Sequence, residues 1–271
     1  MTTTLSVFDE LRKIIYEQSG IKIQDGKETM ISARLASRLR FLELSDVRAY
    51  VDYLKLNMDS EIVEFLDVIS TNVTSFFREA EHFDVMAEFM RKWLEGGQKR
   101  FRFWSAASST GQEPYSLAMT LMEALPKQNH SVDIRILGTD ISTRVLARAS
   151  KGAYAKSNVE EVPVDLRKKY FDKDESGESA AYQVTQEIRD LVSFSRLNLS
   201  SPPFPMSGPF DAIFVRNVMI YFDDRVRDAL VKDCHRLLRP GGLLFVGKSE
   251  GLHNTSQMFD RAGPSIYKKI G

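Results

Sequence analysis

The sequence contains a single cysteine, no excess of charge of either sign and no long hydrophobic run. Because Cys234 has no second cysteine to pair with, an intrachain disulfide is excluded. Lysine plus arginine and aspartate plus glutamate number 37 each, so overall charge gives no support for binding to nucleic acid or to a membrane surface. No apolar run reaches the roughly 18 residues that span a bilayer, and the first residues contain no apolar core of signal-peptide length. We therefore expect a cytoplasmic protein with no membrane insertion and no nucleic-acid partner.

Motifs of several enzyme classes are also missing. The histidines and the cysteine have no metal-ligand spacing, and there is neither a phosphate-binding P-loop nor a G-x-S-x-G nucleophile elbow. The loop at residues 105–111 lacks the G-x-G-x-x-G pattern that holds a dinucleotide pyrophosphate, and Glu113 at the start of the next helix would repel a phosphate. A dinucleotide-dependent oxidoreductase is therefore disfavoured, and we expect no metal.

With 271 residues, 43% of them hydrophobic, the chain can form one large domain or two modest ones. Residues 1–70 show the three-to-four spacing of apolar residues that predicts a small all-helical domain. One of its helices, expected at residues 27–41, places Arg34 and Arg38 on one face, with Arg40 nearby. Such a face is most simply solvated. The alternative is a docking site for an acidic partner.

Residues 71–98 connect this domain to the rest of the chain. Apolar spacing predicts a helix from Glu79 to Trp93, with Ser75 or Thr74 as its N-cap. Arg78 stands beside apolar residues, where an unpaired guanidinium is unfavourable. We expect it to pair with an acid of the protein, the alternative being a charged group of a ligand.

Strands and helices alternate from residue 99 onward, which predicts an α/β domain with a parallel sheet. The expected strands lie at residues 101–104, 133–138, 210–215, 243–246 and 265–270, and the expected helices at 114–125, 143–150 and 225–238. Residues 151–194 interrupt this alternation of strands and helices. Two short strand candidates there, at 180–185 and 191–194, predict an inserted β element near residues 152–195.

Polar residues follow the carboxyl ends of these strands, where open α/β sheets bind their ligands. Asp140 ends the second strand and is placed to accept hydrogen bonds from ribose hydroxyls, although it could instead cap the next helix. Arg216, Asn217 and Tyr221 follow the strand at 210–215. S-adenosylmethionine carries two cationic groups and no phosphate, so it suits a site with Glu113 and a ribose acceptor better than a nucleotide does.

Five segments together resemble the CheR-type chemotaxis receptor methyltransferases: NVTSFFREAEHF (72–83), WSAASSTGQEPYSLAM (104–119), GTDIS (138–142), FDAIFVRNVMIYFD (210–223) and RPGGLLFVGKSE (239–250). The resemblance covers nearly the whole chain. It implies a class I methyltransferase (Rossmann-like) sheet with an inserted small β-subdomain, preceded by a small all-α domain. It also implies methyl transfer from S-adenosylmethionine to glutamates on the cytoplasmic helices of chemoreceptors, giving methyl esters and S-adenosylhomocysteine for sensory adaptation.

The resemblance further implies roles for individual residues. Arg78 and Tyr221 would lie nearest the transferring methyl, and Arg34, Arg38 and Arg40 would dock the receptor helices. The β-subdomain would be able to tether a receptor's C-terminal peptide. The residues lining the cofactor site would be Asn72, Thr74, Arg78, Glu113, Asp140, Asn198, Leu199, Arg216 and Asn217.

The chemistry needs no strong base, because a glutamate with a pKa near 4.3 is already an anion at neutral pH. We therefore expect no catalytic triad. Two alternatives remain open at this point: a methyltransferase with another substrate, and a non-catalytic S-adenosylmethionine-binding signalling module.

Overall fold

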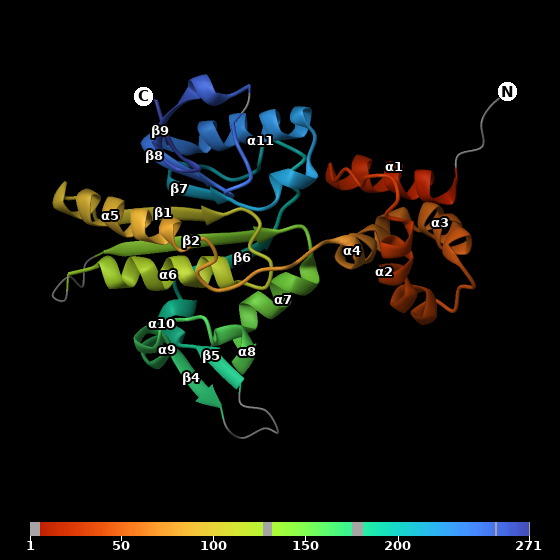
Figure 1. Ribbon diagram of the computed structural model, residues 1–271, viewed down its shortest axis with the longest axis horizontal. Coiled ribbons are helices and arrows are strands. Elements are labelled where there is room, and N and C mark those ends of the chain that lie inside the picture. Colours follow the sequence, from red (N-terminus) through yellow and green to blue (C-terminus); the bar gives the residue numbers. More distant parts are fainter. Residues whose placement is uncertain (1–5, 127–131, 175–180, 253, 271) are drawn as a thin grey trace.

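The computed structural model describes residues 6–126, 132–174, 181–252 and 254–270, which form a helical domain, a central sheet with helices on both faces, and a small β-subdomain (Figure 1). The helical domain comprises α1 (Val7–Ser19), α2 (Glu28–Phe41), α3 (Val47–Leu56) and α4 (Met58–Ile69). Its fully buried core includes Leu11, Ile15, Leu35, Tyr50 and Phe65, which recur at helical spacing along the chain. The prediction of a small all-helical N-terminal domain is confirmed.

Local sequence sets the ends of α1. The Ser6 hydroxyl accepts a hydrogen bond from the Asp9 N–H, and the Asp9 carboxylate accepts one from the Ser6 N–H, which is a capping box. Gly20 ends the helix with a φ of 69°, a left-handed conformation that glycine adopts without strain. A Cβ at Gly20 would lie 2.6 Å from the Cβ of Ser200, so the turn after α1 lies directly against the second domain.

Within the described part of the chain, seven strands form the central sheet in the order β6-β2-β1-β7-β8-β10-β9. The strands β6, β2, β1, β7 and β8 are parallel, whereas β10 and β9 extend the sheet in antiparallel fashion. Their bounds are β1 Arg100–Ser105, β2 Asp133–Asp140, β6 Val192–Arg196, β7 Phe210–Val215, β8 Leu238–Val246, β9 Phe259–Gly263 and β10 Ile266–Lys269. This mostly parallel sheet confirms the predicted α/β methyltransferase-like fold.

Helices cover both faces of the sheet (Figure 1). One face packs against α5 (Glu81–Glu95) and α6 (Gln112–Ala124), and the opposite face packs against α11 (Asp224–Leu237). The helix α7 (Thr143–Lys151) follows β2 and lies against β2 and β6. Short 3-10 helices occur at η1 (Met219–Tyr221) and η2 (Ser256–Met258). Every residue of β7 is buried, as its continuous apolar run predicts.

The β-subdomain hangs below the sheet in Figure 1 and, in the described residues, contains a three-stranded sheet of order β3-β5-β4. Its elements are β3 (Ala153–Ala155), α8 (Lys156–Val159), α9 (Val164–Tyr170), β4 (Phe171–Asp174), β5 (Ala181–Val184) and α10 (Gln186–Arg189). Residue 180, where one strand candidate was predicted to start, lies outside the described residues. The candidate at 191–194 was assigned to the wrong sheet, because β6 pairs with β2 in the central sheet.

Two predictions for residues 71–98 are wrong. The helix α5 begins at Glu81 rather than Glu79, and Ala80 precedes it without a side-chain cap, so neither Ser75 nor Thr74 caps it. The reason is that Phe77 and Glu79 have φ values of 53° and 56°, which an α-helix cannot contain. In the described part of the chain no helix is long and apolar enough to cross a membrane.

Candidate functional site

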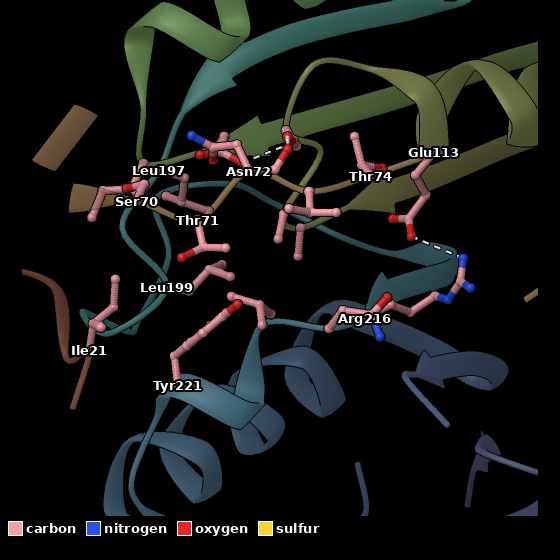
Figure 2. Close-up of a pocket in the computed structure, with 18 of the residues that line it drawn as sticks. Ile21, Ser70, Thr71, Asn72, Thr74, Glu113, Leu197, Leu199, Arg216 and Tyr221 are labelled. Atoms are coloured by element: carbon pink, nitrogen blue, oxygen red, sulfur yellow. Dashed lines mark hydrogen bonds and ion pairs between the residues drawn. The ribbon is translucent and has the colours of Figure 1, made fainter. Parts of the chain in front are cut away.

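A cleft opens at the carboxyl ends of β1, β2 and β7, and its walls come from both domains (Figure 2). It holds about 980 Å³ of space, part of it open to solvent. In Figure 2 Asn72, Thr71 and Thr74 line one side, and Tyr221 points in from the opposite side. Every residue predicted for the cofactor site lies on this cleft, together with Tyr221. These residues are Asn72, Thr74, Arg78, Glu113, Asp140, Asn198, Leu199, Arg216 and Asn217.

The Asp140 carboxylate is fixed by two backbone N–H groups. Its Oδ2 accepts from Ser109 at 2.9 Å and its Oδ1 from Ser142 at 3.0 Å. Burial raises the pKa of this carboxyl, while the N–H groups of Ser142 and Ser109 act in the opposite direction. The cap of α7 is Ser142, whose hydroxyl accepts from Val145, so the alternative role of Asp140 as helix cap is wrong. Asp140 is held rigidly at the cleft as a hydrogen-bond acceptor.

Arg216 is the centre of a buried charge network. Its side chain is only 1% exposed, and its guanidinium donates to the Glu113 carboxylate and the Glu79 carboxylate, both at 3.1 Å, and to the Arg78 carbonyl. Glu113 also accepts from the Ser105 hydroxyl at 2.7 Å. Burial raises the pKa of the Glu113 carboxyl, and Arg216 and Ser105 oppose that rise. When both acids are ionised, this group of described residues carries an excess of negative charge, which favours a cationic ligand.

Arg78 has a different environment from the one predicted. Its guanidinium is exposed and donates at 3.2 Å to the carbonyl of Val73, and no acid among the described residues pairs with it. The expected protein acid is therefore absent from the part of the chain that the structure describes. Because Arg78 lies on the cleft, its charge is available to a ligand group.

Strained backbone gathers around the cleft. Ser109 and Asn217, both on the cleft, have φ values of 47° and 57°, and Phe77 and Glu79 next to Arg78 are also in the left-handed region. Non-glycine residues rarely adopt this conformation, and such residues concentrate at functional sites, where surrounding contacts hold them. Here the Ser109 N–H is held by Asp140, and the Phe77 N–H donates to the Ser116 hydroxyl at 2.9 Å.

The helical domain supplies a wall of the cleft that the sequence did not reveal. Ser19 and Ile21 line the cleft, and the Lys22 N–H donates at 2.8 Å to the Tyr221 carbonyl. Ile21 also pairs with Phe222 in an isolated antiparallel bridge. No local sequence pattern predicts the contact between Ile21 and Phe222, which are far apart in the chain. Gly20 gives a hint, because its lack of a side chain permits the close approach to Ser200.

The basic residues of α2 are mostly engaged within the helical domain. Arg38 pairs with Glu61, which is only 2% exposed and also accepts from the Tyr50 hydroxyl at 2.8 Å. Arg34 donates to the Ile69 carbonyl and, at 2.9 Å, to the Thr71 hydroxyl. Arg40 is exposed, and its side chain has no partner among the described residues. The structure therefore leaves Arg40 as the freest of the three predicted docking residues.

Comparison with known proteins agrees with this architecture. Residues 72–267 match the family described as CheR methyltransferase, SAM binding domain, and residues 6–70 match CheR methyltransferase, all-alpha domain. The chain belongs to the CheR methyltransferase family. The chemotaxis protein methyltransferase of Salmonella typhimurium is 38% identical over 261 residues, covering 96% of this chain and 88% of the relative. Chemotaxis protein methyltransferase 2 of Pseudomonas aeruginosa is 36% identical, covering 96% of this chain and 91% of the relative.

The cleft of this CheR chain fits S-adenosylmethionine, the cofactor of the family. Asp140 places a buried carboxylate on the cleft, the kind of acceptor that a ribose needs, and the acids around Arg216 suit a ligand with cationic groups. The small residues Ala106, Ala107 and Ser109 line the cleft where a ligand must approach the backbone. In the described residues no group of three or more His, Cys, Asp and Glu side chains could hold a metal ion.

Proposed function

We propose that this CheR-family methyltransferase transfers the methyl group of S-adenosylmethionine to glutamate side chains of chemoreceptors in the cytoplasm. The products are glutamate methyl esters and S-adenosylhomocysteine, and the modification serves sensory adaptation. The membership in the family and the names of the relatives, chemotaxis protein methyltransferases, support the activity and the receptor substrate. The specificity for glutamate oxygen rests on the chemistry of the cleft.

The observation that carries this proposal is a pair of polar side chains on the cleft, neither of which has an ion-pair or side-chain partner among the described residues. Arg78 has no acidic partner and Tyr221 has no side-chain hydrogen bond within the described residues, although both line the cleft. A guanidinium pairs well with an incoming carboxylate, and a tyrosine hydroxyl donates one hydrogen bond to an oxygen. These two groups suit an anionic acceptor better than an amine.

The residues need to position the acceptor rather than deprotonate it. A glutamate with a pKa near 4.3 is already a nucleophile at neutral pH. When bound, the cofactor supplies an electrophilic methyl group on a sulfonium. Arg78 and Tyr221 orient the carboxylate, Asp140 holds the ribose, and the walls from both domains limit access of water. Such positioning is worth on the order of 7 to 11 kcal/mol for well-oriented reactants.

The partner in this proposal is the helical cytoplasmic region of a chemoreceptor, which is rich in glutamate. Arg40, with the partly exposed edges of Arg34 and Arg38, would attract this acidic surface in a salt-sensitive way. In the β-subdomain β3 and β4 are the edge strands of the small sheet, and an edge strand can bind a peptide as an added strand. A receptor's C-terminal peptide is the ligand that we propose for one of these two edge strands, β3 or β4.

The test is transfer of labelled methyl from S-adenosylmethionine to receptor-containing membranes, followed by mild base. We expect label on the receptor that base releases as volatile methanol, because a carboxyl methyl ester hydrolyses readily. Base-stable label would mean transfer to another kind of side chain. Absence of label on receptors, with cofactor binding intact, would favour a non-catalytic module.

A further inference from the structure

One carboxylate outside the cleft holds together the chain segments that end at the cleft. In the described part of the chain, the Glu250 side chain accepts hydrogen bonds from the backbone N–H groups of Asn217 at 2.8 Å, Gly247 at 2.6 Å and Ile220 at 3.2 Å. Asn217 follows β7, Gly247 follows β8, and Ile220 lies in η1. Glu250 therefore connects the ends of two neighbouring strands to the short helix that carries Tyr221.

The packing around this carboxylate is very close. A Cβ added at Gly247 would lie 2.6 Å from the Oε2 of Glu250 and 2.7 Å from the Nδ2 of Asn217, so position 247 has no room for a side chain. Asn217 is held with a φ of 57°, and its amide donates at 3.2 Å to Glu79. Asn217 is thus bound by two carboxylates, Glu250 at its backbone N–H and Glu79 at its side-chain amide.

Glu250 does not line the cleft, whereas Asn217, Val218 and Tyr221 do. The same turn is fixed from the helical domain by the bond from the Lys22 N–H to the Tyr221 carbonyl. The position of the Tyr221 ring within the cleft therefore depends on how residues 217–221 are held. Glu250 is connected to the cleft through this turn, which its carboxylate binds at Asn217 and Ile220.

The chemistry of the anchor requires a carboxylate. Its two oxygens accept from N–H groups that would otherwise lack a partner, and bonds to an ionised acceptor are roughly twice as strong as neutral ones. A glutamine of the same size would turn a donor NH₂ group toward at least one of these N–H donors. The side-chain size is kept in that exchange, while at least one of the three anchoring hydrogen bonds is lost.

We infer that Glu250 is a positioning residue of the methyl transfer, which places Tyr221 and Asn217 by binding the backbone N–H groups of Asn217, Ile220 and Gly247. The inference rests on the proposed function for the step that it affects. The anchoring itself is independent of the substrate. No side-chain atom of Glu250 needs to contact cofactor or receptor.

The first measurement is amide hydrogen exchange of residues 217–221 in the full chain. In Glu250→Gln the amides of Asn217 and Ile220, which donate to this side chain, should exchange about tenfold faster than in the wild type, because the anchor that holds them is weakened. Gly247→Ala, which crowds the same carboxylate, should have a similar local effect. Glu81→Gln is the matched control, since Glu81 is an exposed acid whose partner Lys248 lies two residues from Glu250. Unchanged exchange in Glu250→Gln would overturn the inference.

The second measurement is a double-mutant cycle with Tyr221→Phe, using methyl transfer to receptor membranes at saturating substrates. Glu250→Gln should reduce turnover about 100-fold in the wild type and only a few-fold in Tyr221→Phe, because residues that act as a unit are not additive. Equal fractional losses in both backgrounds would indicate a general structural defect and would overturn the inference. If the wild type itself methylates no receptor, the proposed function fails, and the exchange measurement still decides whether Glu250 anchors the turn.

Discussion

The Asp140 carboxylate lies buried at the cleft, at the end of the second parallel strand. In the structure Ser142 caps α7, and Asp140 binds the N–H groups of Ser109 and Ser142 at the cleft. The ribose role stays a prediction, because side-chain contacts to a ligand require the bound complex.

Replacing Asp140 by alanine should weaken binding of S-adenosylhomocysteine about 10- to 100-fold, which corresponds to losing one or two hydrogen bonds to a charged acceptor. Titration calorimetry measures the dissociation constant directly. Asp190→Ala, at an exposed acid near the end of α10, is the control and should leave the affinity unchanged. Unchanged affinity in Asp140→Ala would rule out the ribose role.

Arg78 marks the limit of prediction from one residue's neighbours in the sequence. Its apolar neighbours Phe76 and Phe77 suggested a buried guanidinium that needs an acid. The positive φ values at Phe77 and Glu79 turn the chain instead, so that Arg78 points to the cleft edge while Phe76 is buried. Backbone conformations of this kind have no reliable signature in sequence, and they determine which way a side chain faces.

At the scale of elements, periodicity predicted most helices and strands but not their partners. The strand at residues 210–215 and the helix at 143–150 were found with nearly correct ends, because their apolar patterns are strong. The strand β6 was placed in the inserted β element. Its short pattern fits either sheet. In the structure β6 pairs with β2, and at the Gly138–Phe194 pair a Cβ on Gly138 would meet the Phe194 ring at 2.8 Å. Such tertiary fits are not visible in a single sequence.

The helix α2 gives an element-scale prediction, because two of its arginines differ in environment. Arg38→Ala should destabilise the protein by about 3 kcal/mol, since it leaves the buried Glu61 carboxylate without its guanidinium. Arg40→Ala, on the same helix but exposed, should change stability by less than about 0.5 kcal/mol. Chemical denaturation of both variants measures this difference. Equal stabilities would show that the Arg38–Glu61 pair contributes nothing.

Because Arg38 pairs with Glu61, Arg38 is a poor position for testing receptor docking. Charge reversal at Arg38 would place an acid beside Glu61 and Glu64 and destabilise the helical domain, so slower methylation would not identify a docking residue. Arg40→Glu avoids this problem. It should slow receptor methylation in a salt-dependent manner and leave cofactor affinity intact. An unchanged rate at low salt would remove Arg40 from the docking surface.

At the scale of the whole molecule, the two domains are joined by specific polar contacts beside the cleft. The Tyr16 hydroxyl donates to the Asp223 carboxylate at 2.5 Å, and the Asn198 amide donates to the Gln18 carbonyl at 2.8 Å. On α4 Asp67 accepts from the Thr143 hydroxyl at 2.9 Å, next to Asp140. The helical domain is thereby joined to the segments that line the cofactor cleft.

The hydrogen bond between Tyr16 and Asp223 makes the stability of this interdomain contact depend on pH. The Tyr16 hydroxyl and then the Val226 N–H hold the pKa of the Asp223 carboxyl below its usual range. A depressed pKa means that the stabilisation is complete above the unfolded value of about 3.9 and is lost as pH falls through the lower folded value. Urea denaturation should therefore show Tyr16→Phe less stable than wild type at pH 6, with the difference shrinking below about pH 4.

The control is Tyr53→Phe, whose hydroxyl has no partner among the described residues. A difference that stays constant with pH would contradict this account of the interdomain contact.

The most direct test of the central claim is to locate the transferred methyl group by tandem mass spectrometry of a chemoreceptor cytoplasmic fragment. After incubation with the protein and S-adenosylmethionine, the account predicts the added mass of one methyl group on glutamate side chains, removed by mild base and absent without the protein. A methyl group found on lysine, arginine or a chain terminus, or a base-stable product, would contradict it.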